Sequence, residues 1–148
     1  MDVRLRRATN KDTDFARRTH HDAFRDVVVR QFGRFDEQHQ DAFFDAEWDP
    51  KTYEIVVVDD EPAGYAQIED ADDAIRVRQI VIAPAYQNRG AGRDVMSDVI
   101  ERARTTDKPV WLGALFENRG AQRLYKRLGF REIGKTETHV LMEWRSEE

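Results

Sequence analysis

The stretch at residues 80–93, IVIAPAYQNRGAGR, decides how this chain folds. Its first residues, Ile80, Val81 and Ile82, are β-branched and typical of a buried strand, which Pro84 ends. Two glycines follow in a loop that leads directly into a helix. Glycines let the backbone turn its N–H groups toward one point, and the N-terminus of the helix adds positive partial charge there. The stretch therefore predicts an anion-binding turn suited to a pyrophosphate.

Two arginines flank this turn. Arg89 and Arg93 stand on either side of Gly90-Ala91-Gly92 and can reach phosphate oxygens. The turn lacks the Lys-Ser/Thr ending of a nucleotide-triphosphate loop, and it lacks the third glycine of the dinucleotide fingerprint. The local pattern alone therefore leaves the phosphate ligand open.

Three predicted strands precede the turn. They cover a β-branched run at residues 53–58 and two further runs at residues 63–69 and 75–82. Turn-forming residues at 59–62 and 70–73 join them. Short connections between consecutive strands predict an antiparallel meander.

The segment after the turn predicts a helix, a strand, a second helix and two strands. The first helix places these apolar residues on one face: Val95, Met96, Val99, Ile100 and Ala103. A strand at residues 110–114 then completes a strand–helix–strand unit, which predicts a parallel crossover. The second helix covers residues 119–128 and ends at Gly129. The last strands are expected at residues 130–133 and 138–144.

The N-terminal segment predicts one strand and a long helix. Val3 and Leu5 alternate with arginines, as in a half-buried strand. Thr9 lies three residues before Asp12, an acidic variant of the capping signature, and opens a helix that ends near Gly33. Two neighbouring rows make its apolar face: Phe15, Thr19, Ala23 and Val27, and Ala16, Phe24 and Val28.

A second short helix follows Asp36, and Pro50 closes it. One side of this helix carries Phe35, His39, Phe43 and Ala46. Phe43 and Trp48 are expected in the core. The predicted order is β-α-α-β-β-β-α-β-α-β-β, and the fold class is α+β, a mixed α/β sheet flanked by helices.

The composition fits one domain over residues 1–148. The chain has a mass of 17.4 kDa and is 40% hydrophobic and 36% charged, which is too apolar for a disordered chain. The net charge of -5 argues against a nucleic-acid partner. The apolar runs are too short to span a membrane, and no signal peptide is visible, so we expect a cytoplasmic protein.

Several classes of site are excluded by residue type. The chain has no cysteine, so disulfides, thiolate metal sites and a cysteine nucleophile are ruled out. No metal site is expected, because the adjacent His20 and His21 do not face together on a helix. A partly exposed helix face is the expected place of this pair.

Two motifs in this sequence resemble the signatures of the GNAT superfamily of N-acetyltransferases. Residues 87–92, QNRGAG, resemble its Q/R-x-x-G-x-G/A motif, and residues 82–84, IAP, resemble its strand-end V-x-P element. Residues 118–130, NRGAQRLYKRLGF, are similar to its second motif, N-x-x-A-x-x-L-Y-x-x-x-G-F. The motifs keep the order and separation of the family, and the likeness covers roughly residues 3–144.

This resemblance implies a GNAT-like fold in which the fourth strand bulges and splays from the fifth. It also implies acetyl-CoA as the donor and a primary amine, on a small molecule or a peptide, as the acceptor. The residues that it assigns to the donor are Ile80, Val81, Ile82, Gln87, Asn88, Arg89, Gly90, Ala91, Gly92, Arg93, Asn118, Ala121 and Tyr125. Among these, the backbone of the strand and Asn118 hold the pantetheine arm, and the amides at 88–93 hold the pyrophosphate. Tyr125 lies beside the sulfur.

Direct transfer of an acetyl group from a thioester to an amine needs no covalent enzyme nucleophile. It expels a thiolate, and a phenol within reach can protonate it, which is the role expected of Tyr125. An alkylammonium must also lose a proton before it attacks. Many relatives carry a glutamate on the fourth strand for this, but this chain has none there. Glu69 is the nearest acidic alternative, and Gln79 can position a water.

Three interpretations of the whole chain remain open from the sequence. The first is an active N-acetyltransferase. The second is a non-catalytic module of the same fold that binds acyl-CoA as a sensor or partner domain. The third is an unrelated phosphate-binding domain, in which the second motif would be a coincidence. The identity of the amine is not encoded in any pattern that we find. The final strands of such folds can build a homodimer, so the oligomeric state also stays open.

Overall fold

The computed structural model describes residues 1–146. Its seven strands are β1 (Val3–Arg7), β2 (Glu54–Val58), β3 (Glu61–Asp70), β4 (Ile75–Ile82), β5 (Val110–Leu115), β6 (Arg131–Lys135) and β7 (His139–Trp144). Its α-helices are α1 (Thr13–Phe32), α2 (Glu37–Glu47), α3 (Ala91–Thr106) and α4 (Arg119–Arg127). Short 3₁₀ turns precede α1, β2 and α3. The predicted order of elements is confirmed.

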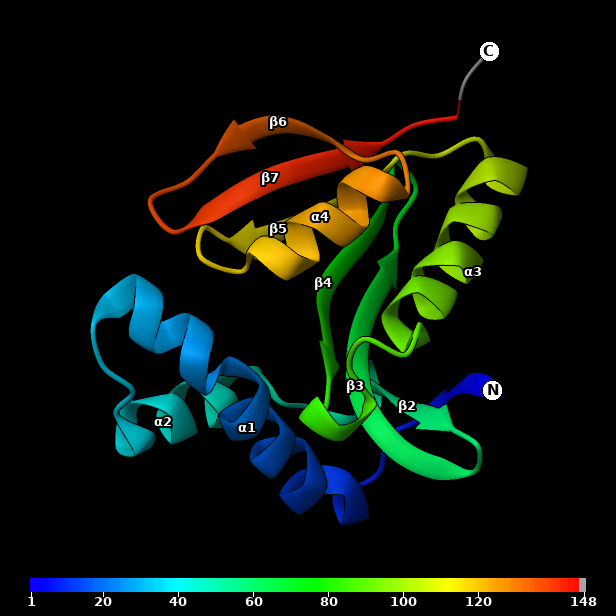
Figure 1. Cartoon of the computed structure of the whole chain (residues 1–148). Coiled ribbons are helices and arrows are strands. Elements are labelled where there is room, and N and C mark those ends of the chain that lie inside the picture. The colour runs from blue at the N-terminus through cyan, green and yellow to red at the C-terminus, as the bar shows by residue number, and fades with distance from the viewer. Residues whose placement is uncertain (147–148) are drawn as a thin grey trace.

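All seven strands belong to one sheet, in the order β1-β2-β3-β4-β5-β7-β6 (Figure 1). Neighbouring strands are antiparallel except β4 and β5, which run parallel and are joined through α3. The predicted antiparallel meander of β2, β3 and β4 and the predicted parallel crossover are therefore both present. The α+β class, a mixed sheet with flanking helices, is confirmed.

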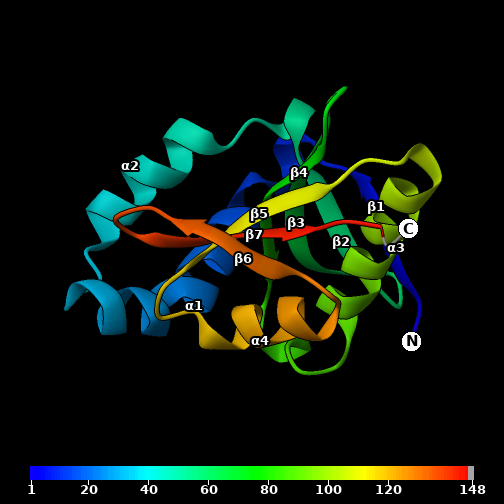
Figure 2. The same ribbon diagram turned by 90° about the horizontal axis from the view of Figure 1, so that it is seen from above.

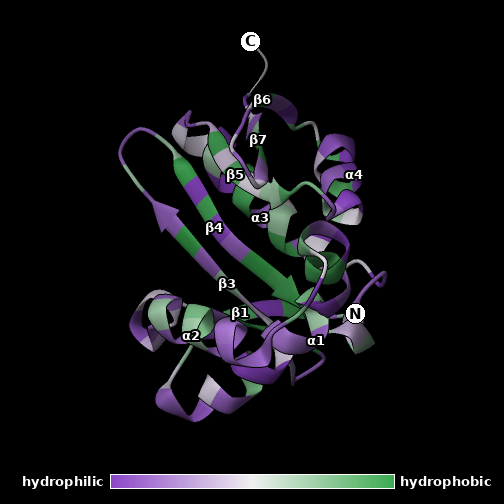
Figure 3. Ribbon diagram, turned by 90° about the vertical axis from the view of Figure 1, so that its left-hand side faces the viewer, coloured by the Kyte–Doolittle hydropathy of each residue, from purple (hydrophilic) through white to green (hydrophobic). Residues whose placement is uncertain are grey.

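Helices cover both faces of the sheet. α1 and α2 pack on one face over a core that includes Ala16, Phe44, Ile55 and Tyr65. α3 packs on the other face, and α4 lies beside it against the second half of the sheet (Figures 1 and 2). The outer surfaces of the helices are mostly hydrophilic, whereas β4 alternates between hydrophobic and hydrophilic residues and becomes continuously hydrophobic at its end (Figure 3). No helix among residues 1–146 is long and apolar enough to cross a bilayer.

The caps of α1 lie where the sequence places them. Thr9 and Asp12 form a capping box at the start of the 3₁₀ turn Asn10–Asp12, which leads directly into α1: the Thr9 hydroxyl accepts a hydrogen bond, and the Asp12 carboxylate accepts one from the Thr9 amide at 2.8 Å. Gly33 ends the helix with a φ of 89°, a left-handed conformation that favours glycine. The predicted apolar face of α1 is buried at Ala16, Val27 and other positions.

The prediction for the buried side of α2 is wrong in part. Phe43 is 49% exposed, whereas the adjacent Phe44 is 4% exposed and belongs to the core. Trp48 packs against this core as expected, with its ring stacked on Phe44 at 5.5 Å. Because Phe43 and Phe44 are adjacent, α2 has two candidate apolar faces, and the helical spacing of apolar residues alone does not decide which face is buried.

β4 contains a bulge in its middle, at Arg78. Gln67 of β3 pairs with Gln79, but the next residue of β3 pairs with Val77, so Arg78 is left without a partner. One extra residue reverses the alternation of side chains along a strand. Val77 therefore packs on the α3 side of the sheet, whereas Val81 packs on the α1 side.

The parallel pairing of β4 with β5 ends at the same place. The registered pairs run from Ile75 with Val110 to Val77 with Leu112, and none follows. Residues 78–82 of β4 therefore present an edge that no strand pairs on the β5 side. The sheet opens at its middle, as the resemblance implied.

Candidate active site

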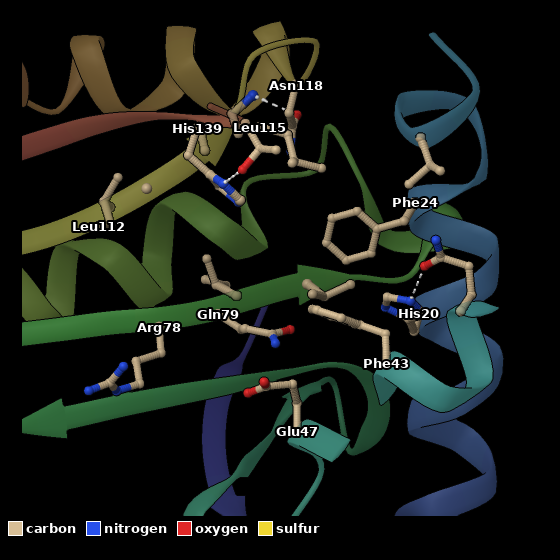
Figure 4. Close-up of a pocket in the computed structure, with 18 of the residues that line it drawn as sticks. His20, Phe24, Phe43, Glu47, Arg78, Gln79, Leu112, Leu115, Asn118 and His139 are labelled. Carbon is tan, nitrogen blue, oxygen red and sulfur yellow. Dashed lines mark hydrogen bonds between the residues drawn. The ribbon is translucent and has the colours of Figure 1, made fainter. Parts of the chain in front are cut away.

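A cavity of about 830 Å³ lies where β4 and β5 separate, and α1 and α2 form its opposite wall (Figure 4). Its lining from the sheet side includes Arg78, Gln79, Ile80, Val81, Leu115, Asn118, Ala121, Tyr125 and His139. Its lining from the helical side includes His20, Phe24, Val28, Phe32, Gln40, Phe43 and Glu47. The cavity therefore joins the residues of the second motif to the N-terminal helices.

The structure brings together some of the predicted site residues and leaves others apart. Gln79, Ile80, Val81, Asn118, Ala121 and Tyr125 all line the cavity. Ile82 and the loop at residues 87–93 lie outside its lining, at the end of β4. A side-chain carbon placed on Gly92 would lie 3.6 Å from Leu124 and 3.9 Å from Ile82. The loop thus packs where the strand end meets α4.

Tyr125 is buried on α4 with its ring 5.7 Å from that of Phe130. Burial raises the pKa of Tyr125 to about 12, so the phenol is neutral at physiological pH. Its hydroxyl makes no hydrogen bond with residues 1–146, yet no fully buried side-chain oxygen in that range lacks a partner. The hydroxyl is therefore reached through the cavity that Tyr125 lines, and it is available as a donor.

The N-terminus of α3 presents free amides. The first helical hydrogen bond runs from the Asp94 amide to the Gly90 carbonyl at 2.9 Å. The amides of Ala91, Gly92 and Arg93 precede this bond and have no partner within the helix. Their positive partial charge would attract an anion to this end of α3.

The turn before α3 is held in place by its neighbours. Gln87 donates a side-chain hydrogen bond to the Ile82 carbonyl at 2.9 Å, which ties the loop to the end of β4. Asn88 and Gly90 adopt positive φ of 61° and 90°. The Arg89 guanidinium lies over the ring of Tyr86 at 5.6 Å. These contacts fix the conformation of the loop.

Asn118 is the N-cap of α4, and its side-chain oxygen accepts a hydrogen bond from the Ala121 amide at 3.3 Å. Its side-chain NH₂ makes no hydrogen bond with residues 1–146, so it can donate to a ligand in the cavity that Asn118 lines. Gln31 of α1 reaches the residue before it: its oxygen accepts from the Glu117 amide at 3.1 Å, and its NH₂ donates to the Thr138 carbonyl at 2.9 Å. Through Gln31, α1 is therefore tied to the loops that flank β5 and β7 in the second half of the sheet.

Glu69 does not reach this cavity. Its carboxylate accepts a hydrogen bond from Arg78 at 2.7 Å and lies 3.6 Å from a nitrogen of Arg76. These ion pairs hold Glu69 at the far end of β3, which gives no geometric support to its expected role as a base. Gln79, the other expected residue, does line the cavity.

Sequence reasoning missed two polar groups of the helical wall. His20, expected on a partly exposed face, is 4% exposed, and its Nε2 lies 2.9 Å from Gln40 Oε1. Burial lowers the pKa of His20, so the ring is neutral at pH 7. Glu47, at the end of α2, extends toward Gln79 (Figure 4). Phe43 and Glu47 are four residues apart, which puts these two side chains on one side of α2, and this spacing could have indicated Glu47 from the sequence.

Comparison with known proteins identifies the class. The model of the acetyltransferase (GNAT) family matches residues 17–130. This chain therefore belongs to the GNAT acetyltransferase family. An uncharacterized N-acetyltransferase of Methanocaldococcus jannaschii is 29% identical over 96 residues, which make up 63% of this chain and 40% of that protein. The chain thus spans less than half the length of this curated relative.

Solved structures share the fold. The PaiA N-acetyltransferase of Thermoplasma acidophilum, in complex with coenzyme A, superposes with a TM-score of 0.80 over 99% of this chain and 100% of that one, at 10% identity. The ribosomal-protein-S18-alanine N-acetyltransferase of Escherichia coli gives a TM-score of 0.66 over 97% and 94% of the two chains, at 18% identity. At these identities the likeness establishes the architecture.

Proposed function

We propose that this chain is an N-acetyltransferase that moves an acetyl group from acetyl-CoA to a primary amine by direct attack. The observation that carries the proposal is the unpaired edge of β4 beyond Val77. This edge opens into the cavity that Tyr125 and Asn118 line, and free amides lie where the strand ends. Family membership and a neighbour that binds coenzyme A support the same assignment.

The residues present fit each part of the donor. The pantetheine arm carries amide groups, which an unpaired strand edge bonds as it would a further strand. Residues 80–82 supply that edge, and the Asn118 NH₂ supplies a further donor. The amides of Ala91, Gly92 and Arg93 suit the diphosphate. In this proposal the thioester lies next to Tyr125.

Tyr125 acts on the departing sulfur. A phenol with a pKa of about 12 is a weaker acid than an ordinary thiol, whose pKa is about 8.5, so complete proton donation to the thiolate is uphill. The Tyr125 hydroxyl stabilises the sulfur by donating a hydrogen bond to it. As the hydroxyl gives its proton to the sulfur, it receives a proton from the attacking nitrogen. The relay avoids a free phenolate.

Thiol release tests the proposal. Acetyl-CoA is titrated calorimetrically, and release of free thiol is then followed with a panel of small amines and peptides. The proposal predicts saturable binding and amine-dependent release. Saturable binding with no release on any amine would instead support the second candidate, an acyl-CoA sensor of the same fold. Absence of binding at sub-millimolar concentration would overturn both.

A further inference from the structure

The helical wall of the cavity is strongly apolar. Phe24, Val28 and Phe32 follow one another at four-residue spacing along α1 and line it, and Phe43 of α2 joins them. Phe32 is 52% exposed and Phe43 is 49% exposed, which is unusual for large apolar side chains. The ring of Phe43 is stacked on His20 at 6.0 Å. This wall offers a surface that an apolar ligand would cover.

One charged group in the cavity has no partner. Arg34 pairs with Asp36 at 3.0 Å, and Arg78 pairs with Glu69. Glu47 forms no hydrogen bond or ion pair with any residue in the range 1–146, and its side chain extends toward Gln79 (Figure 4). An unpaired carboxylate beside an apolar surface is complementary to a cation that carries an apolar body.

We propose that the acceptor is a small primary ammonium with an apolar body, and that Glu47 binds the ammonium and takes its proton. The inference rests on the proposed function and names the substrate class and the base. The aromatic wall receives the hydrocarbon part. The size of the acceptor is inferred from the tie between α1 and the loops at Glu117 and Thr138, which Gln31 makes beside the cavity and which would obstruct a continuing peptide chain on that side.

The proton balance is complete within this arrangement. The ammonium gives one proton to the Glu47 carboxylate, and the neutral nitrogen forms a bond to the thioester carbonyl carbon. The carbon–sulfur bond breaks, and its electron pair stays on sulfur. The second proton of the nitrogen reaches the sulfur through the Tyr125 hydroxyl. Glu47 then releases its proton to water, so one proton is released per amide formed.

A series of amines tests the substrate class. Phenethylamine and hexylamine carry apolar bodies, ethanolamine and spermidine carry polar ones, and a lysine peptide represents a larger acceptor. The expected kcat/KM is at least about tenfold higher for phenethylamine and hexylamine than for the other three acceptors, because burial of even one methylene group in an apolar pocket changes kcat/KM by about this factor. Phe43→Ala removes the preference, whereas Val29→Ala, an exposed apolar residue of α1 outside the cavity lining, preserves it.

The pH profile of Glu47→Gln tests the base. In the wild type, Glu47 takes the proton of the bound ammonium, so kcat changes little between about pH 7 and 9. The variant depends on amine that is already neutral, so its rate falls by about 1,000-fold at pH 7 and rises about tenfold per pH unit toward the amine pKa near 10.4. Glu37→Gln, on the same helix but outside the cavity lining, is the control.

Neither Glu47→Gln nor Glu37→Gln alters the other titratable residues around the cavity, which are His20, Arg34, Asp36, His39, Tyr53, Arg78, Tyr125 and His139. Binding of acetyl-CoA by Glu47→Gln is expected to equal that of wild type, which shows that the variant is folded. Turnover with a preference for spermidine or the peptide, or an unchanged pH profile in Glu47→Gln, would overturn the inference while the proposed function stands. Absence of all acetyl transfer would overturn both.

Discussion

Tyr125 and Tyr53 are two buried phenols with different surroundings. Burial raises the pKa of each to about 12, yet only Tyr125 lines the cavity. The resemblance of the second motif to the family pattern pointed to Tyr125 and Asn118 in the sequence, and both residues line the cavity. No motif contains Glu47, whose place depends on how α2 packs against α1.

Replacement of Tyr125 with Phe is expected to lower kcat by about 10- to 100-fold and leave the affinity for acetyl-CoA unchanged. The lost hydrogen bond to a charged sulfur is worth about 1.5–3 kcal/mol in the transition state. Steady-state kinetics on an accepted amine measure this, and Tyr53→Phe is the matched control. Equal kcat in wild type and Tyr125→Phe, with chemistry rate-limiting, would contradict the role.

The same phenols make stability fall at high pH. Their folded pKa lies above the unfolded value of about 10, so the unfolded chain ionises first and the folded chain only near 12. The contribution of these two tyrosines to the free energy of unfolding is expected to be constant below about pH 10 and to decrease toward pH 12. Tyr125 contributes up to about 2–3 kcal/mol of this loss. Urea unfolding at several pH values checks it, and Tyr125→Phe should flatten the decrease.

Elements, in contrast to single side chains, follow closely from local sequence. The caps at Thr9 and Gly33 and the turn at Gly90 lie where residue type predicts them, because each depends on neighbours within a few positions. The bulge at Arg78 has no local signal in the sequence, and only the resemblance to the family implied it. The face of α2 was mispredicted because its orientation depends on contacts with α1.

Gly90→Ala tests the turn before α3. A side chain at its φ of 90° is strained, and its carbon would lie 2.7 Å from the Arg93 guanidinium. The expected cost is about 1–2 kcal/mol of stability together with at least a tenfold loss of affinity for acetyl-CoA. Gly33→Ala is the matched control, because it has a φ of 89° and open space around it. It should lose similar stability and keep full affinity, and an equal loss of affinity in both variants would contradict the account.

At the scale of the whole molecule, the parting of β4 from β5 creates the site. Three pairs of residues hold the two strands together, and the cavity begins where these pairs end. The two motifs lie far apart in the sequence, but the crossover through α3 brings them to this opening. The sequence predicted this topology from short connections, whereas the shape of the helical wall required the packed structure.

The crystal structure of the complex with acetyl-CoA is the most direct test of the account. The account predicts the diphosphate on the amides of Ala91, Gly92 and Arg93, the pantetheine arm along β4, and the sulfur next to the Tyr125 hydroxyl. Density for the diphosphate away from the start of α3, or a sulfur remote from Tyr125, would contradict it.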